Sequence, residues 1–183
     1  MILASQSPRR YELLKMITED FSVLPANADE TIPDGSTPGD AVQYLAKQKA
    51  CEIRTLTSTH TIVAADTVVT IDGKILGKPK DVKDAMAMLT MLSGRTHSVF
   101  TGVCVIDADG TEHVFAEETK VEFYPLEPDE IMEYIMSGEP MDKAGAYGIQ
   151  EKGALFVKRI DGDYYNVMGL PVARLSRVLK GKE

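Results

Sequence analysis

An aspartate within an apolar stretch is the residue of this chain best suited to chemistry. Asp66 lies in residues 61–71, where β-branched side chains are typical of a strand that is buried on both faces. An ionised carboxylate that leaves water is costly unless a cation, a metal ion or several hydrogen-bond donors compensate its charge. Asp66 therefore indicates a functional site, and a strand-end aspartate that caps the following turn is the simpler alternative.

Two lysines follow this strand on a segment that turns back towards it. Asp72-Gly73 predicts a tight turn, and the returning chain contains Lys78 and Lys80. Their ammonium groups could hold an anion near Asp66, whereas solvated loop lysines are the alternative. These residues leave both interpretations open.

Two arginines lie at the start of a predicted helix. Ser7 and Pro8 are typical of a helix N-cap and first position, here for a helix over residues 8–16. Arg9 and Arg10 would therefore lie beside free backbone N–H groups, where donors, dipole and guanidinium groups all favour a phosphate. Because basic residues oppose the helix dipole at this end, an ordinary exposed first turn would favour acidic residues instead.

A further lysine falls on the apolar face of a long helix predicted over residues 37–56. Lys49 follows the same three-four spacing as the apolar side chains of this helix. These apolar residues are Val42, Leu45, Ala46, Ile53 and Leu56. The ammonium group either extends to the helix edge or points into a pocket that requires a cation.

Two segments lack both helical and strand periodicity. Residues 26–39 are rich in acidic residues, proline and glycine, and the sequence alone does not identify Asp29 or Glu30 as a metal ligand. Residues 139–150 contain small flexible residues and end in Gln150. An irregular segment of this kind within a folded domain is typical of a binding loop.

The remaining periodicity completes an α/β protein. Strands are predicted over residues 1–5, 21–25, 96–106 and 111–124, and helices over 82–92, 127–137 and 171–180. The helix over 82–92 is expected to bury Val82, Ala85, Met86 and Leu89. A second hairpin, with strands over 153–160 and 164–167, is predicted across Asp161-Gly162. His97 has no evident nucleophile as partner and is expected to be structural or on the surface.

Composition limits the classes of function. The chain has 183 residues, and its content of 44% apolar and 26% charged residues is typical of a soluble globular protein. Its net charge of −8 disfavours a broad surface for nucleic acid. No apolar run approaches the ~20 residues that a membrane span needs, and we expect a cytoplasmic protein. Cys51 and Cys104 lack metal-site spacing and are expected to be reduced thiols.

Five motifs occur in order along the chain: ASQSPRR at 4–10, AADTVV at 64–69, GKP at 77–79, LSGRTH at 92–97 and DKAGAYGIQ at 142–150. Together they resemble the Maf family of nucleoside triphosphate pyrophosphatases. The match runs in register from residue 1 to about Val172, and five ordered motifs are far more specific than one. One departure is the charged connection Glu151-Lys152-Gly153, which makes the closure of the last motif uncertain.

The resemblance implies a fold and a reaction. The fold would be a strongly curved mixed β-sheet flanked by helices, with two lobes and a central cleft as in inosine triphosphatases, and residues 1–183 would form a single domain. The reaction would be hydrolysis of a nucleoside triphosphate to the monophosphate and pyrophosphate with a divalent cation, Mg²⁺ or Mn²⁺. The family is also associated with septum formation and division arrest. One branch acts on dTTP and UTP, and modified pyrimidine nucleotides are an open extension.

The resemblance also implies a role for each matching residue. Asp66 would be the general base, and Glu30 and Asp66 would share the metal. Ser5, Arg9, Arg10, Lys49 and Lys78 would bind the triphosphate. Arg9, Thr67 and Gln150 match the dTTP/UTP branch and would determine specificity.

Two alternatives stay open. A nucleotide-binding regulator without catalysis would retain the cations and the loop. A phosphomonoesterase of the haloacid-dehalogenase type would use Asp66 as a nucleophile, but residue 68 is Val where that chemistry requires a second Asp. The expected partner is a nucleoside triphosphate, with no nucleic acid and no membrane, and the existence of a homodimer is open.

Overall fold

The computed structural model describes residues 1–29 and 31–182, which form two compact units. Unit 1 consists of Met1–Thr67, Thr101–Glu117 and Tyr165–Glu183, and unit 2 consists of Val68–Phe100 and Glu118–Tyr164. Three of the four boundaries fall within long strands, and the fourth falls within the short helix α5 (Tyr164–Met168). Glu30, expected as a metal ligand, lies outside the described residues.

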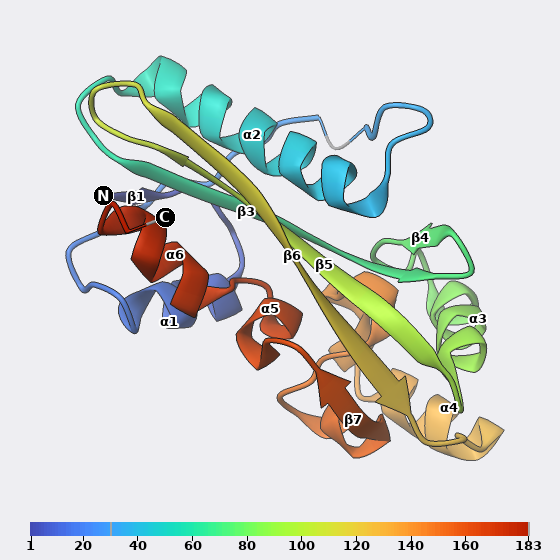
Figure 1. Cartoon of the computed structure of the whole chain (residues 1–183). Coiled ribbons are helices and arrows are strands. Elements are labelled where there is room, and N and C mark those ends of the chain that lie inside the picture. The colour runs from blue at the N-terminus through green and yellow to red at the C-terminus, as the bar shows by residue number, and fades with distance from the viewer. Residues whose placement is uncertain (30, 183) are drawn as a thin grey trace. The chain divides into compact units, whose positions relative to one another are not determined.

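Unit 1 contains the parallel part of the sheet (Figure 1). β1 pairs in parallel with β2 on one side and with β3 on the other, and the pairing with β3 matches Leu3 to Val63. The elements that begin in this unit are β1 (Ile2–Leu3), α1 (Pro8–Lys15), β2 (Ser22–Val23), α2 (Pro38–Leu56), β3 (Ile62–Ile71), β6 (Glu112–Phe123) and α6 (Val172–Leu179).

Both faces of β3 are covered in unit 1, because its side chains alternate between two cores. Val63 and Ala65 pack with residues of α1 and α6, whereas Ile62 and Ala64 pack with residues of α2. Figure 1 shows α1 beside α6 and α2 on the other side of the strands. This arrangement confirms the prediction of a strand that is buried on both faces.

A glycine allows α2 to approach the sheet closely. Gly102 lies in β5 (Thr96–Ile106), and a Cβ atom at this position would lie 2.3 Å from the backbone carbon and oxygen of Val42 in α2. No side chain can relieve such a contact, because both atoms belong to the backbone. The position of α2 over the strands therefore requires glycine at 102.

Unit 2 contains two further helices and a series of short 3₁₀ turns. Its elements are β4 (Lys74–Leu76), α3 (Val82–Leu92), α4 (Pro128–Met136), the 3₁₀ turns η1 (Glu139–Asp142), η2 (Ala144–Ala146) and η3 (Lys152–Phe156), and β7 (Val157–Asp161). β4 pairs antiparallel with Val69–Ile71 of β3. α3 packs against α4, and both contact the 3₁₀ turns.

In the described part of the chain, seven strands form one mixed sheet in the order β2-β1-β3-β5-β6-β7, with β4 paired to β3. β6 spans Glu112–Phe123, and a short helix, α5, spans Tyr164–Met168. The mixed sheet with flanking helices confirms the predicted fold class. Among the described residues, no helix has both the length and the apolar character to span a membrane.

The predicted second hairpin is wrong. β7 pairs with β6 instead, and Tyr164–Met168 is a helix. Gly162, at a φ of 133°, lies against Thr119 of β6, whose hydroxyl donates to the carbonyl of Asp163 at 3.0 Å and accepts from its amide at 3.0 Å. The chain after β7 is thus tied to β6, so it cannot continue as a strand beside β7.

Two predicted helix faces are wrong in part. Leu56, at the end of α2, is 67% exposed, and Val82, at the start of α3, is 47% exposed. α3 buries Met88 and Leu92 in place of Val82 and Met86. Both exposed residues lie in terminal turns, where the helix extends past its partners and periodicity no longer reports burial.

We expect Gly102→Ala to lower the free energy of unfolding by about 1–3 kcal/mol, because the added Cβ overlaps backbone atoms of Val42. Urea denaturation of the parent and the variant measures this change. Gly39→Ala in α2 is the matched control, since a Cβ at position 39 has no atom within 4 Å. A variant at position 102 as stable as the parent would show that α2 can move away from β5 without cost.

Candidate active site

The carboxylate of Asp66 forms an ion pair with Lys49. The two groups lie 2.6 Å apart, and their side chains are 13% and 12% exposed. Asp66 follows Ile62 and Ala64 along β3 and so faces α2, where Lys49 lies between the buried Ala46 and Ala50. The ammonium therefore points towards the carboxylate rather than extending to the helix edge, which decides between the two predictions for Lys49.

A second cluster forms around Arg10 in the first turn of α1. Its Nη2 donates to Thr67 Oγ1 at 2.9 Å, its Nε donates to the carbonyl of Gly169 at 2.8 Å, and Nη1 lies 3.4 Å from Ser5 Oγ. Thr67 follows Val63 and Ala65 along β3, so it faces α1. Three of the predicted substrate-binding residues, Ser5, Arg10 and Thr67, are thus brought together.

The two clusters lie on opposite faces of β3, because Asp66 and Thr67 are consecutive in a strand. Both residues lie past the last hydrogen bond between β1 and β3, from Ala4 N to the Val63 carbonyl. Crevices beyond the carboxyl ends of parallel strands are the usual ligand sites of α/β sheets. A ligand at the end of β1 could therefore reach both faces.

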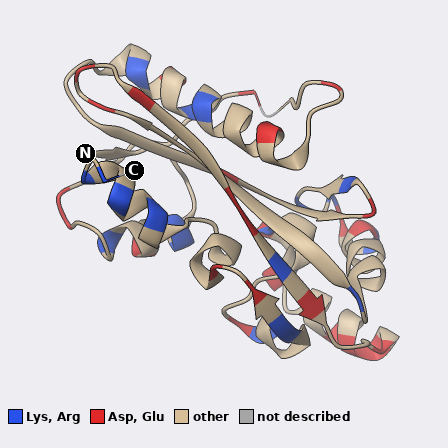
Figure 2. Cartoon of the chain, in the orientation of Figure 1, with Lys and Arg blue, Asp and Glu red and all other residues tan. Residues whose placement is uncertain are grey.

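The end of β1 leads directly into the N-terminus of α1. Ser7 caps this helix by accepting from the amide of Arg10 at 3.4 Å, and Pro8 occupies its first turn, both as predicted. Arg9 is half-buried beside Arg10. The helix N-terminus and two guanidinium groups together favour an anion here. In the cartoon of Figure 2, positions of basic residues are coloured blue on α1, α2 and α6 of unit 1, and positions of acidic residues are coloured red on α4 of unit 2.

Lys78 and Gln150 belong to unit 2 and are both exposed. The loops that carry them are joined by a hydrogen bond from the amide of Gly145 to the carbonyl of Gly77 at 3.0 Å. Gly145 has a φ of 66°, and a Cβ there would lie 2.8 Å from the side chain of Val69. Two of the five motifs therefore meet within unit 2.

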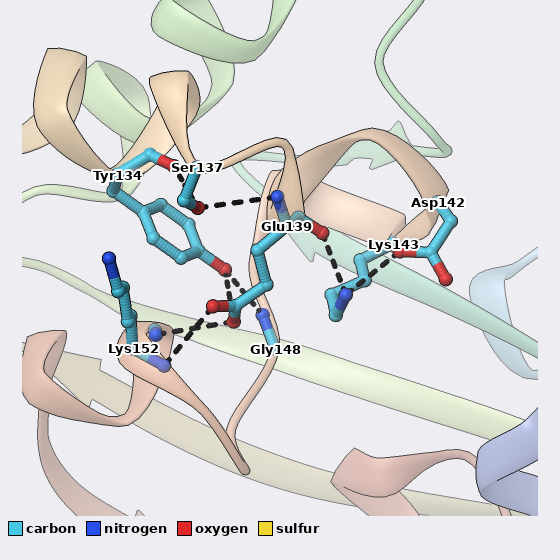
Figure 3. Close-up of polar contacts among 8 residues, drawn as sticks. Tyr134, Ser137, Glu139, Asp142, Lys143, Gly148 and Lys152 are labelled. Atoms are coloured by element: carbon cyan, nitrogen blue, oxygen red, sulfur yellow. Dashed lines mark hydrogen bonds and ion pairs between the residues drawn. The ribbon is translucent and has the colours of Figure 1, made fainter.

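The loop that ends in Gln150 is fastened by Glu139 (Figure 3). Its Oε1 accepts from the hydroxyl of Tyr134 at 2.8 Å, and its Oε2 accepts from the amide of Lys152 at 3.1 Å. The Tyr134 hydroxyl also accepts from the amide of Gly148 at 3.0 Å. Glu139 thus holds both sides of the segment 148–152, and the charged connection that made closure uncertain is closed by this carboxylate.

Lys143, in the same loop, is structural. It is 9% exposed, and its ammonium donates to the carbonyl of Glu139 at 2.7 Å and to Asp142 Oδ1 at 2.8 Å. Sequence analysis did not assign any role to Glu139 or Tyr134. Spacing rules do not identify them, because Tyr134 and Glu139 are five residues apart and their other partners, Gly148 and Lys152, lie 14 and 13 residues away in irregular chain.

The described residues offer Asp66 as a ligand for a divalent metal. Its Oδ1 is engaged by Lys49, and its Oδ2 makes no hydrogen bond to a described residue. No group of three or more His, Cys, Asp or Glu side chains able to hold a metal occurs in the part of the chain that the structure describes. One carboxylate fits Mg²⁺, which commonly binds through one or two carboxylates together with substrate phosphates and water.

His97 is buried in an aromatic cluster beneath the same loop. It is 2% exposed, its Nε2 lies 2.8 Å from the hydroxyl of Tyr147, and its ring packs edge-on against Phe123 at 4.8 Å. Burial lowers the pKa of His97 to about 4, because the charged imidazolium would lose its hydration. His97 is therefore a structural residue, as expected.

Sequence comparison places the chain among known proteins. The family model described as Maf-like protein matches residues 1–182. A dTTP/UTP pyrophosphatase of Bacillus pumilus is 51% identical over 180 residues, covering 98% of this chain and 95% of the relative. A protein of the same name from Bacillus cytotoxicus is 51% identical over 179 residues, covering 98% and 93%.

Structural comparison agrees at the level of fold. The Staphylococcus aureus Ham1 protein aligns with a TM-score of 0.59 and 17% identity, covering 100% of this chain and 98% of that one. A HAM1 protein from Coxiella burnetii aligns with a TM-score of 0.53 and 16% identity, covering 98% of each chain. The chain thus has an α/β fold like that of the Ham1 proteins. The chain belongs to the Maf-like family, and the resemblance seen in its sequence is confirmed.

We expect the protein to lose stability as pH falls from about 6.5 to about 4, because the folded state disfavours protonation of His97 while the unfolded chain accepts the proton. The contribution of neutral His97 to the free energy of unfolding is complete above the pKa of this residue in the unfolded chain, and it declines as the pH falls towards the pKa in the folded protein. Protonation of His97 in the unfolded chain should make the free energy of unfolding about 2–3 kcal/mol lower at pH 4.5 than at pH 7.5.

Urea denaturation at both pH values measures the loss. His97→Phe is the control, since its ring cannot be protonated and it should show a smaller decline over the same range. Equal declines in the parent and in His97→Phe would mean that carboxylates alone cause the acid sensitivity.

Proposed function

We propose that this protein hydrolyses dTTP and UTP to the nucleoside monophosphate and pyrophosphate. The observation that carries the proposal is the Lys49–Asp66 ion pair, which lies past the last hydrogen bond between β1 and β3, on the face of β3 that meets α2. The names of relatives about half identical over nearly the whole chain support the choice of substrate. Modified pyrimidine nucleotides are an extension of the same proposal.

The chemical step requires a base for water, and Asp66 is suited to this role. Its Oδ2 accepts a proton from the water, whose oxygen forms a bond to the α-phosphorus as the bond to the bridging oxygen breaks and pyrophosphate leaves. Lys49 holds Oδ1 at 2.6 Å and so fixes the orientation of the carboxylate. The low exposure of both side chains limits competition by other waters.

Binding of the triphosphate is assigned to the cations of the five motifs. Arg9, Arg10, Ser5, Lys49 and Lys78 bind phosphate oxygens in this proposal, and Arg9, Thr67 and Gln150 select the base. Asp66, with Glu30, would hold a divalent cation, Mg²⁺ or Mn²⁺, which withdraws charge from the phosphates when bound. Since the family match extends over both units, we propose that residues 1–183 act as one domain. The cytoplasm stays the predicted compartment.

Product analysis on a panel of nucleoside triphosphates tests the reaction. With Mg²⁺, the protein should release pyrophosphate from UTP and dTTP faster than from GTP or ATP. Release of orthophosphate instead would support a phosphomonoesterase that uses Asp66 as nucleophile. Binding of UTP without turnover would support the nucleotide-binding regulator.

Asp66→Asn should lower kcat by about 10²–10⁴-fold, because the amide has nearly the same shape but cannot accept the proton. Circular dichroism and thermal denaturation check that the variant is folded. Asp72→Asn is the matched control, since Asp72 lies at the end of the same strand, is exposed and pairs only with Arg95 among the described residues. A folded Asp66→Asn protein with the turnover of the parent would refute the general base.

Gln150→Glu should lower kcat/KM for UTP and dTTP by an amount equivalent to about 1–3 kcal/mol, because mispaired polar groups at a binding site are costly. Uracil and thymine present an O4 acceptor beside an N3–H donor, and a primary amide complements both. A carboxylate can only accept, so it suits the two donors of guanine better. The test is to measure kcat/KM for UTP, dTTP and GTP in the parent and in Gln150→Glu. If the ratios between the nucleotides were the same in both proteins, Gln150 would not contact the base.

A further inference from the structure

A chain of hydrogen bonds leads from Arg10 through two threonines to the backbone of α5. Arg10 Nη2 lies 2.9 Å from Thr67 Oγ1, which lies 2.9 Å from Thr101 Oγ1. The Thr101 hydroxyl in turn lies 2.9 Å from the carbonyl oxygen of Asn166. Thr101 is fully buried, and sequence analysis assigned it no role.

The alternation of side chains along two neighbouring strands explains why these groups meet. In β5, Thr101 shares the face of Val103 and Val105, which pack in the core with α1 and α6. Thr67 lies on the same face of β3, the neighbour of β5 in the sheet. The two threonines therefore form a cross-strand pair on the side from which Arg10 approaches.

The chemistry of the groups fixes the direction of every hydrogen bond in this chain. The carbonyl of Asn166 can only accept, so the single hydroxyl proton of Thr101 is donated to it. Thr101 must then accept from Thr67, which uses the only proton of the Thr67 hydroxyl. Thr67 in turn accepts from Arg10, whose guanidinium can only donate.

This direction restricts what Thr67 can do for a ligand. Because its proton is donated to Thr101, the Thr67 hydroxyl can offer a ligand only a lone pair. It therefore cannot form a hydrogen bond to phosphate or carbonyl oxygens, which are themselves acceptors. Arg10 is oriented by the Thr67 hydroxyl and by the Gly169 carbonyl, which accepts from Nε at 2.8 Å. A guanidinium held from two sides is preorganised for an anion.

We propose that Thr101 is a positioning residue that fixes the polarity of Thr67, and that Thr67 acts by orienting Arg10 towards the triphosphate rather than by donating to the substrate. The inference rests on the proposed function but revises one role in it, because it moves Thr67 from selection of the base to anion binding through Arg10. It predicts that position 67 affects the affinity for any polyphosphate, whatever base is attached.

A double-mutant cycle with inorganic triphosphate as the probe tests this. Thr67→Val and Thr101→Val should each weaken its binding about 10-fold, the effect of losing one hydrogen bond that orients a charged donor. The double variant should be no weaker than Thr67→Val alone, since both act on the same chain. Isothermal titration calorimetry measures each affinity. Additive losses, or loss at Thr67→Val alone, would overturn the proposal.

Two further variants separate positioning from simple stability. Thr101→Ser retains the hydroxyl and should restore the affinity of the parent. Thr119→Val is the matched control, because Thr119 is equally buried and its hydroxyl also donates to a backbone carbonyl, that of Asp163, but it is not a member of the chain from Arg10 to Asn166. It should lose stability without losing affinity. A similar loss of affinity in Thr119→Val would reduce Thr101 to a structural residue.

A measurement on the unaltered protein does not depend on the folding of any variant. The Thr67 hydroxyl proton should lie between the two threonine oxygens, and its nuclear Overhauser effect to the methyl group of Thr101 reports this position. A proton of Thr101 directed at Thr67 would overturn the assignment. The affinity for inorganic triphosphate and the coupling between Thr67 and Thr101 test this inference, whereas release of pyrophosphate tests the proposed reaction. If the two threonines were coupled but no nucleotide were hydrolysed, only the proposed reaction would be refuted.

Discussion

The constraint on which this structure depends is that one strand, β3, is covered on both faces within unit 1. Because its side chains alternate, each residue meets either α2 or the pair α1 and α6, and the next residue meets the other. The same rule that divides the apolar residues into two cores divides the polar ones. Asp66 meets Lys49 of α2, and Thr67 meets Arg10 of α1. A one-residue shift in register would turn Asp66 towards α1 and Thr67 towards α2, so neither residue would meet its present partner.

In unit 2, the irregular loop over residues 139–150 is held by side-chain hydrogen bonds rather than by a strand or a long helix. Buried backbone groups in such a loop need partners. Glu139 supplies them from one side chain, since a carboxylate can accept several hydrogen bonds at once. The hydroxyl of Tyr134 links this carboxylate to Gly148, and the ring of Tyr134 packs edge-on against Phe156 at 5.0 Å. Polar closure of the loop is thus anchored in the aromatic cluster.

The features that were predicted from sequence are those encoded locally. The cap at Ser7, the start of the long helix near residue 37, the long strands and the loop over 139–150 each depend on a few neighbouring residues. Asp66 and Lys49 were each identified as unusual, but their pairing arises from the packing of α2 on β3, which periodicity does not specify. Thr101 had no signal, because a threonine is ordinary in a strand. Residues 164–167 have strand-forming composition and yet form a helix, since β propensity depends strongly on context.

The Lys49–Asp66 pair is difficult to explain by stability alone. Removing two charges from water costs several kcal/mol for each ion, and apolar residues of similar volume in such positions are often as stable or more stable. Surrounding residues of α2 and β3, such as Ala46 and Ala64, show that the local packing accepts apolar side chains. The general base of the proposed reaction has the opposite requirement, because it must be held in one orientation and kept from bulk water. A nearly buried carboxylate fixed through one oxygen by an ammonium meets both conditions. The proposed role of Asp66 therefore explains the pair better than the stability of the fold does.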